Sequence, residues 1–380
     1  MTGHSLAGIA AKLLYNGLIY RYKNITGKPM KPQAVSLEIT HRCIARCIMC
    51  NIWRIPKEEP ELSIDEWLTF LSDDFLSDVR ELDITGGEPF LLDDIDLLFT
   101  GISRLSKRNL TKLKSVAVTT NGFLTDRVID KTEKILMDFS KAGLDLVVVC
   151  ALDAIGEVHE KIRNVKDAFK KVISTIDKLS ELRGRYPNLI IGIKTTILPL
   201  NIDELEDISK YARERGLFTI MSPCIITSGR YLNKDNKKEL QFSKEDKEKM
   251  IRFFKGGQFR WSFHADSLVK YLKTGFMRKP CACGFNYFFI RSSGELYLCP
   301  LVNMSSGNIK DEEIKSLLLS SNATEFRKKV CKFPECRDCT EPGLERYALT
   351  CEGFTYLRAL FKLGQRFKLL HSQLGLDKYI

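Results

Sequence analysis

Six near-continuous apolar segments alternate with helix-like segments between residue 34 and about residue 224. Strands that are apolar along their whole length are buried on both faces, which is typical of a parallel sheet covered by helices. An α/β fold is therefore expected, with fewer strands than the eight of a closed α/β barrel. The sequence predicts strands at 34–40, 81–85, 115–121, 145–153, 189–197 and 217–224, and helices at 63–75, 92–105, 126–142, 165–182 and 202–215.

A cysteine motif follows the first expected strand directly. Cys43, Cys47 and Cys50 have the spacing C-x3-C-x2-C. Three thiolates on one short loop can bind three irons of a [4Fe–4S] cluster and leave the fourth iron open to a cofactor or substrate. Electron-transfer ferredoxins use four cysteines, and structural zinc needs a fourth ligand. His41 is the only nearby candidate for that ligand and lies too close to Cys43, so the spacing favours a cluster.

A second motif, GGEP, ends the second expected strand at residues 86–89. The glycines let the backbone approach a ligand closely, and Glu88 supplies a carboxylate that suits an ammonium group. In barrel-like sheets, chemistry occurs where the parallel strands end. Asn121 and Asp153 end the third and fourth expected strands, so polar groups from four strands converge on one rim.

Together these motifs resemble those of the radical S-adenosylmethionine (SAM) superfamily. The resemblance implies a partial (β/α)6 barrel of the TIM type, in which the open iron of the [4Fe–4S] cluster chelates SAM. It implies reductive cleavage of SAM to a 5′-deoxyadenosyl radical that abstracts hydrogen from a substrate. Glu88 would contact the methionine amine and Met49 would lie near the adenine. The residues expected to bind SAM are Met49, Gly86, Gly87, Glu88, Pro89, Asn121, Asp153 and Arg163.

Residues 150–169 resemble the S-L-D-G…H-D…R-G stretch of that family, with departures. Ala151 stands where serine is usual, and Ala154 and Asn164 stand where glycine is usual. A serine hydroxyl contact to SAM must therefore be absent or replaced. Asn121 and Asp153 are expected to contact the ribose or nearby groups. Arg163 either pairs with the SAM carboxylate, which a guanidinium fork fits, or lies on a helix surface.

A second group of cysteines occupies residues 281–351. A predicted hairpin with strands at 288–291 and 295–298 precedes a C-x2-C pair, and the segment resembles the SPASM domain or its shorter Twitch variant. That resemblance implies an auxiliary [4Fe–4S] cluster, although Glu345 replaces the next cysteine of a full SPASM pattern. The implied ligands are Cys281, Cys299, Cys336 and Cys339, with three alternatives: Cys283 in place of Cys281, a second cluster on Cys283, Cys331 and Cys351, or zinc on the same four cysteines.

Cysteine usage and charge limit the cellular setting and the partners. The twelve cysteines cluster in two regions without an N-terminal signal peptide, which indicates reduced thiols and a cytoplasmic location. The net charge of +11 is dispersed, so no nucleic-acid partner is expected. No apolar run reaches the roughly 20 residues of a membrane span. Segments 5–24 and 353–376 are expected to be basic amphipathic helices that pack across the barrel end or contact an anionic membrane peripherally.

The expected domains follow from these segments. They are an N-terminal helical extension (1–33), the partial barrel (34–225), a helical linker (226–275), a small α+β cysteine-rich auxiliary-cluster domain (276–350) and a C-terminal amphipathic helix (351–380). Cys224 ends the sixth expected strand. Its thiol could donate a hydrogen atom to a product radical or ligate substrate, or it could be a buried apolar filler.

The predicted function is radical SAM chemistry on a small molecule, for oxidation or rearrangement, with the auxiliary cluster as electron acceptor. Residues 1–33 are too few for the extra peptide-recognition domain of many peptide-modifying relatives, which favours a small-molecule substrate. The alternatives are peptide or protein maturation, lipid modification at a membrane surface, and a metal-binding scaffold without SAM turnover. A one-electron reductant such as ferredoxin or flavodoxin is the expected redox partner.

Overall fold

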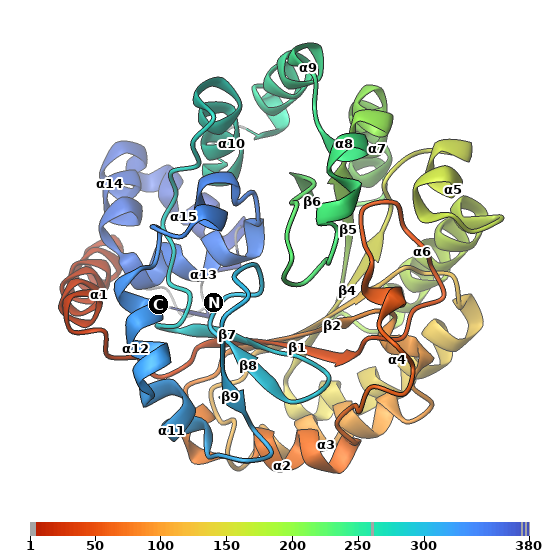
Figure 1. Ribbon diagram of the computed structural model, residues 1–380. Helices are drawn as coiled ribbons and strands as arrows, with labels where there is room; N and C mark the ends of the chain where they lie inside the picture. The colour runs from red at the N-terminus through yellow and green to blue at the C-terminus, as the bar shows by residue number, and fades with distance from the viewer. Residues whose placement is uncertain (1–4, 260–261, 374, 377, 380) are drawn as a thin grey trace.

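A continuous curved sheet forms the centre of the molecule, and helices cover its outside (Figure 1). The computed structural model describes residues 5–259, 262–373, 375–376 and 378–379, so small parts of the predicted linker and terminal segments lie outside the described residues. The sheet order is β6-β5-β4-β3-β2-β1-β7-β8-β9. The strands are β1 (Ala34–Thr40), β2 (Glu81–Gly86), β3 (Ser115–Thr120), β4 (Asp145–Ala151), β5 (Leu189–Ile197), β6 (Phe218–Pro223), β7 (Tyr287–Ile290), β8 (Glu295–Tyr297) and β9 (Ser305–Asn308).

Strands β1 to β6 are all parallel, and each pairs with the next along the chain. Every residue of β1 is buried, as expected for a strand covered on both faces. The connecting helices are α2 (Ile64–Leu71), α3 (Ile95–Leu105), α4 (Thr125–Ala142), α5 (Glu157–Arg163), α6 (Ala168–Arg185) and α7 (Leu205–Glu214). This arrangement is the predicted partial (β/α)6 barrel. The predicted helices 63–75 and 202–215 are shorter, because the turns at 74–76 and 199–204 are 3₁₀-helical.

The predicted hairpin continues the barrel sheet. Strand β7 pairs with β1 in parallel, with Tyr287 opposite Ala34, and β8 and β9 follow in antiparallel order. The pairing with β1 and the strand β9 were not predicted from the sequence. The cysteine-rich segment is therefore joined by backbone hydrogen bonds to the strand that precedes the first cysteine motif.

The remaining helices cover the open side of the barrel and the C-terminal segment (Figure 1). They are α1 (Leu6–Thr26), α8 (Lys237–Leu240), α9 (Lys244–Phe254), α10 (Phe263–Thr274), α11 (Ile314–Leu319), α12 (Ser321–Lys328), α13 (Pro342–Glu352), α14 (Phe354–Leu363) and α15 (Phe367–Gln373). The prediction of one helix over 353–376 was wrong, because the chain breaks after α14 at Gly364, which has a φ of 54°.

Helix α1 packs closely on α13 and α14. A Cβ atom added to Gly17 would lie 2.7 Å from the Phe354 ring, and Asn16 donates a hydrogen bond of 2.9 Å to the carbonyl oxygen of Thr350. Its inner face is therefore part of the C-terminal helical layer. Among the described residues, none of the helices has both the length and the apolar character needed to cross a membrane.

Candidate active site

A cavity lies where the parallel barrel strands end, and most of the predicted site residues line it. It is bordered by the first cysteine loop, the GGEP turn and the ends of β3, β5 and β6. Glu88, Pro89 and Asp153 are not among the lining residues. The predicted residues that do line it are Cys43, Cys47, Met49, Cys50, Gly86, Gly87, Asn121, Arg163 and Cys224.

The three cysteines of the first motif converge on this cavity. Cys47 is buried, and Cys43 and Cys50 are partly buried. Burial, together with the neighbouring thiols, raises the pKa of both Cys43 and Cys50 to about 12. A bound cation reverses this effect and favours the thiolate. Three converging thiols with little other polar contact therefore fit the three-cysteine iron–sulfur cluster that the spacing predicts.

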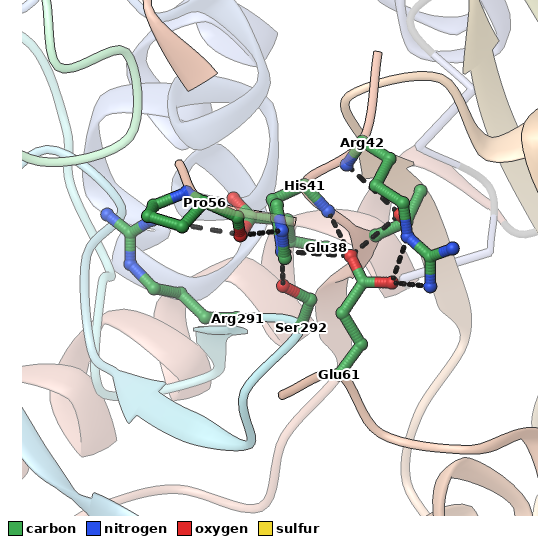
Figure 2. A network of polar contacts seen from close by, with 8 residues as sticks. Glu38, His41, Arg42, Pro56, Glu61, Arg291 and Ser292 are labelled. Carbon is green, nitrogen blue, oxygen red and sulfur yellow. Dashed lines mark hydrogen bonds and ion pairs between the residues drawn. The ribbon is translucent and has the colours of Figure 1, made fainter. Parts of the chain in front are cut away.

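The start of the cysteine loop is held by the partly buried carboxylate of Glu61 (Figure 2). Glu61 accepts hydrogen bonds from the Thr40 hydroxyl at 2.8 Å and from the backbone N–H of His41 at 2.7 Å, and it pairs with Arg42 at 2.7 Å. Burial opposes the charge of Glu61, but these hydrogen bonds together lower its pKa. The loop therefore starts from a fixed backbone position.

His41 belongs to the same network. Its Nδ1 lies 2.9 Å from Glu61 Oε1 and 3.4 Å from Ser292 Oγ, and its Nε2 lies 3.0 Å from the carbonyl oxygen of Pro56. Ser292 follows β7, so the ring links the cysteine loop to the C-terminal hairpin, as Figure 2 shows. Both ring nitrogens of His41 therefore have protein partners.

The GGEP glycines lie against the cysteine loop. The backbone N–H groups of Gly87 and Glu88 donate to the carbonyl oxygens of Thr40 and Arg42, both at 2.8 Å. A Cβ atom on Gly86 would lie 2.1 Å from the Thr40 oxygen, and one on Gly87 would lie 2.1 Å from the Arg42 oxygen. The close approach that requires glycine here is therefore to the protein backbone, while both glycines also border the cavity.

Glu88 joins the ends of β2 and β3. Its carboxylate is fully buried and accepts hydrogen bonds from the Thr120 hydroxyl and the Asn121 backbone N–H, both at 2.7 Å. Burial raises its pKa to about 7. The Asn121 side chain accepts from Phe123 N–H, and its Nδ2 has no partner among the described residues. Asn121 therefore offers a hydrogen-bond donor to a ligand, whereas the contact of Glu88 with the SAM amine stays a prediction.

Arg163 is buried and faces the cysteine loop. Its Nη2 lies 2.6 Å from Asp153 Oδ2, and its Nη1 donates to the sulfur of Cys47 across 3.6 Å. The alternative of a helix-surface arginine is therefore wrong. The carboxylate of Asp153, which does not line the cavity, holds the guanidinium of Arg163 in place. Helix α5 ends at Arg163, and the residue after it, Asn164, has a left-handed φ of 51°. Asparagine tolerates that conformation, which explains how it can replace the usual glycine.

Four ionisable residues that line the cavity were not predicted from the sequence. Lys194 lies in the middle of β5, Arg230 and Tyr231 follow β6, and Glu341 precedes α13. Burial opposes the charge of Glu341, but Lys194 and Arg230 outweigh it and lower the Glu341 pKa. A lysine inside an otherwise apolar strand is a sequence signal that could have identified Lys194. No such signal marks Arg230 or Glu341.

The cysteines of the C-terminal segment form a second group. Hydrogen bonds from Cys283 and Cys331 lower the pKa of Cys281, although burial opposes them, and Cys283 is also hydrogen-bonded to Cys299. The charges of Cys336 and Cys339 act on the same cluster of thiols. The four predicted ligands and two of the alternative ones are therefore neighbours. Cys351 lies to one side, where its sulfur contacts Met30 at 3.5 Å.

Comparison with known proteins matches both parts of the chain. The profile of the Radical SAM superfamily matches residues 37–212, and that of the SPASM iron–sulfur cluster-binding domain matches residues 281–340. The sporulation killing factor maturation protein of Bacillus subtilis is 22% identical over 317 residues, which cover 82% of this chain and 72% of that protein. The subtilosin biosynthesis protein AlbA of the same organism is 23% identical over 294 residues, covering 76% of this chain and 60% of that protein.

Solved structures show the same fold. The structure of SuiB from Streptococcus suis bound to S-adenosylmethionine has a TM-score of 0.58 and 12% identity, and the match covers 84% of this chain and 75% of that one. At this identity the likeness concerns the fold alone.

Proposed function

Because this chain belongs to the radical SAM superfamily and carries a SPASM domain, we propose that it is an enzyme that modifies a peptide. The observation that carries the proposal is the match of both parts of the chain to a relative named for the maturation of a killing factor. A second relative is named for the biosynthesis of a bacteriocin. These relatives favour the peptide alternative over the small-molecule substrate that the sequence predicted.

Cys43, Cys47 and Cys50 would hold the SAM-binding [4Fe–4S] cluster, which together with SAM supplies a 5′-deoxyadenosyl radical for hydrogen abstraction. Asn121 would offer its Nδ2, which has no partner among the described residues, to a ligand in the cavity. Arg163 donates to Cys47 and keeps a cation beside the cluster loop. The protein thus fixes where a substrate C–H bond must lie, and that placement accounts for much of the rate enhancement of such enzymes.

The auxiliary site would be held by Cys281, Cys299, Cys336 and Cys339, with Cys283 as the alternative first ligand. A substrate radical formed by hydrogen loss would pass one electron to this site and release one proton, which completes a two-electron oxidation. The electron needed for SAM cleavage would come from a reductant such as ferredoxin or flavodoxin. A short chain segment links the two sites, since Glu341 lines the cavity two residues after Cys339.

The test is an anaerobic assay of reconstituted protein with dithionite and SAM, in the presence and absence of a pooled peptide library. We expect 5′-deoxyadenosine from the wild type, more of it with peptides, and peptides that have lost two hydrogens by mass spectrometry. The variant Cys43→Ala/Cys47→Ala/Cys50→Ala should give none of these products. Stimulation by small metabolites without any peptide response would contradict the peptide proposal.

Metal analysis of the same sample tests the auxiliary site. About eight irons per chain are expected for two four-iron clusters. About four irons with one zinc would make the C-terminal site structural and remove its role as electron acceptor.

We also propose that α1 and its neighbour α14 contact an anionic membrane surface (Figure 1). The outer face of α1 exposes a row of large apolar side chains, and the helix carries three cations and no acidic residue. Helices of this kind lie in the membrane interface. Sedimentation with anionic vesicles tests the proposal. The exposed row is Leu14, Tyr15, Leu18, Tyr22 and Ile25, each between 46% and 78% exposed.

A further inference from the structure

Two cations on the cavity wall are not needed to hold the first cysteine loop. Among the described residues that line the cavity, the cations are Arg163, Lys194 and Arg230, and the carboxylate is Glu341. The charge of Arg163 is already matched by the buried Asp153 at 2.6 Å. Lys194 and Arg230 both lie near Glu341, and the carboxylate of Asp83, which does not line the cavity, also acts on both cations.

Lys194 is held in place by the sheet, while its side chain lines the cavity. It lies in β5 opposite Ala151 of β4 and Ile220 of β6, so the sheet fixes its backbone. Within the described part of the chain its ammonium group makes no hydrogen bond or ion pair. An ammonium group at a cavity wall that makes no hydrogen bond to the described residues has donors left to bind an anion.

Arg230 is held rigidly beside it. Its Nη2 donates to the Thr85 hydroxyl at 2.6 Å, and its guanidinium lies 5.6 Å from the centre of the Phe289 ring. Arg230 opposes the charge of Lys194, although Tyr231 and Glu341 outweigh this effect and raise the Lys194 pKa. Like charges held together in a site of low dielectric are relieved by a bound anion.

Glu341 reaches the cavity from the C-terminal segment. The Thr340 hydroxyl donates to the carbonyl oxygen of Pro223 at 2.8 Å, which fixes this segment to the end of β6. The Glu341 carboxylate accepts from the Gly343 N–H at the start of α13. Its position is thus set by the protein, and its remaining acceptor capacity faces the same space as the two cations.

We propose that Lys194 and Arg230 form a subsite for a carboxylate of the substrate, with Glu341 accepting an adjacent N–H group. This proposal rests on the proposed peptide-modifying function, in which an acidic side chain or a free C-terminus would supply the carboxylate. A guanidinium and an ammonium side by side bind a carboxylate through charge-assisted hydrogen bonds. The subsite would orient the substrate on the wall formed by β5 and the segments that follow β6 and Cys339.

The first experiment uses anaerobic holoenzyme saturated with SAM and the probe pair glutarate and glutaramide, measured by calorimetry. We expect glutarate to bind the wild type and glutaramide to bind at least about tenfold more weakly, because charge-assisted hydrogen bonds are lost. Lys194→Gln should weaken glutarate binding about tenfold, while Lys194→Arg should retain most of it. Lys210→Gln, which removes an exposed lysine from α7, should bind as the wild type does.

Two results would overturn the subsite. One is equal binding of glutarate and glutaramide, or of glutarate to wild type and Lys194→Gln. The other is a SAM affinity that falls tenfold or more in Lys194→Gln with folding intact by circular dichroism, since the carboxylate would then be that of SAM. Unchanged SAM affinity with weakened glutarate binding supports the subsite.

A peptide arm separates this inference from the proposed function. The SAM-loaded holoenzyme would select from a random heptapeptide library, and we expect enrichment of acidic residues or free C-termini by the wild type but not by Lys194→Gln. No peptide enrichment together with specific glutarate binding would contradict the peptide function and keep the carboxylate subsite. Peptide enrichment without any preference for carboxylates would support the peptide function and contradict the carboxylate subsite.

Discussion

The guanidinium of Arg163 donates to the sulfur of Cys47 across 3.6 Å and also pairs with the carboxylate of Asp153. One arginine thus connects a cluster-binding thiol to a fully buried carboxylate. Asp153 in turn accepts from the backbone N–H of Thr196 at 2.8 Å, so the ion pair also ties α5 to β5. The position of Cys47, the second cysteine of the motif, therefore depends on the buried ion pair of Arg163 and Asp153.

Arg163→Met should destabilise the cluster-free protein by about 3–5 kcal/mol, because it leaves the charge of Asp153 buried and unpaired. Urea denaturation at pH 7 measures the loss. The double variant Asp153→Asn/Arg163→Met should recover much of it, since no buried charge remains. Equal stability of Arg163→Met and wild type would show that the ion pair contributes nothing.

Gly87→Ala should prevent assembly of the first iron–sulfur cluster. The added Cβ would lie 2.1 Å from the carbonyl oxygen of Arg42, so the GGEP turn and the cysteine loop cannot both keep their positions. The control is Gly184→Ala on α6, where nothing lies within 4 Å and a gain of about 0.5–1 kcal/mol is expected from helix propensity. Iron content and the visible absorption of the cluster report assembly. Full iron loading of Gly87→Ala would contradict the steric argument.

His159 should make the protein less stable as the pH falls. Burial lowers its pKa to about 3, and its Nδ1 accepts a hydrogen bond of 3.1 Å from Asp153 N–H. The unfolded chain takes up this proton near pH 6.5, whereas the folded chain does not until about pH 3, so stability is lost as the pH falls through this interval. From pH 7 to pH 5 the contribution is about 2 kcal/mol.

The variant His159→Asn keeps an acceptor near the position of Nδ1 and removes the titration. Its free energy of unfolding, measured by urea at pH 7, 6 and 5 without the cluster, should fall less than that of the wild type. Parallel losses in both proteins would assign the pH dependence to other groups.

The barrel strands could be predicted closely because their apolar runs are nearly continuous. Strand β5 begins and ends where predicted, and β1 does as well. The pairing of β7 with β1 could not be predicted, since the two strands are far apart in sequence and nothing in a four-residue apolar strand specifies its partner. The break at Gly364 was missed because both sides continue the same apolar pattern.

Some residues of the candidate site could likewise be predicted from the sequence, and others could not. Cys43, Cys47 and Cys50 could be identified because cluster ligands need a fixed spacing on one loop. Arg230 could not, since it follows β6 in an irregular segment and reaches the cavity only through the fold. The role of Gly86 was only partly foreseen, because the backbone it approaches belongs to β1.

The exposed row on α1 should bind anionic vesicles. We expect the wild type to sediment with phosphatidylglycerol vesicles at low salt and to be released by high salt, since basic residues contribute electrostatic attraction. Leu18→Glu/Tyr22→Glu should reduce binding about tenfold or more. Leu97→Glu changes a similarly exposed leucine on α3 and should have no effect. Failure of the wild type to bind at low salt would exclude a membrane role for α1.

Replacement of Cys224 distinguishes two fates of the substrate radical. The thiol lines the cavity, and burial raises its pKa to about 12, so it keeps its hydrogen at neutral pH. If the radical passes an electron to the auxiliary site, Cys224→Ala should leave the ratio of product to 5′-deoxyadenosine unchanged within about twofold, and we expect this result. If Cys224 returns a hydrogen atom, the ratio should fall at least about tenfold.

In the second case the thiyl radical would regain an electron and a proton with the help of the external reductant. Cys150→Ala is the matched control, because Cys150 is fully buried in β4 and does not line the cavity. The ratio of product to 5′-deoxyadenosine in Cys150→Ala should equal that of the wild type under either mechanism. A fall in Cys224→Ala alone would therefore replace net oxidation by hydrogen return as the outcome of the reaction, with the auxiliary site no longer needed as an electron acceptor.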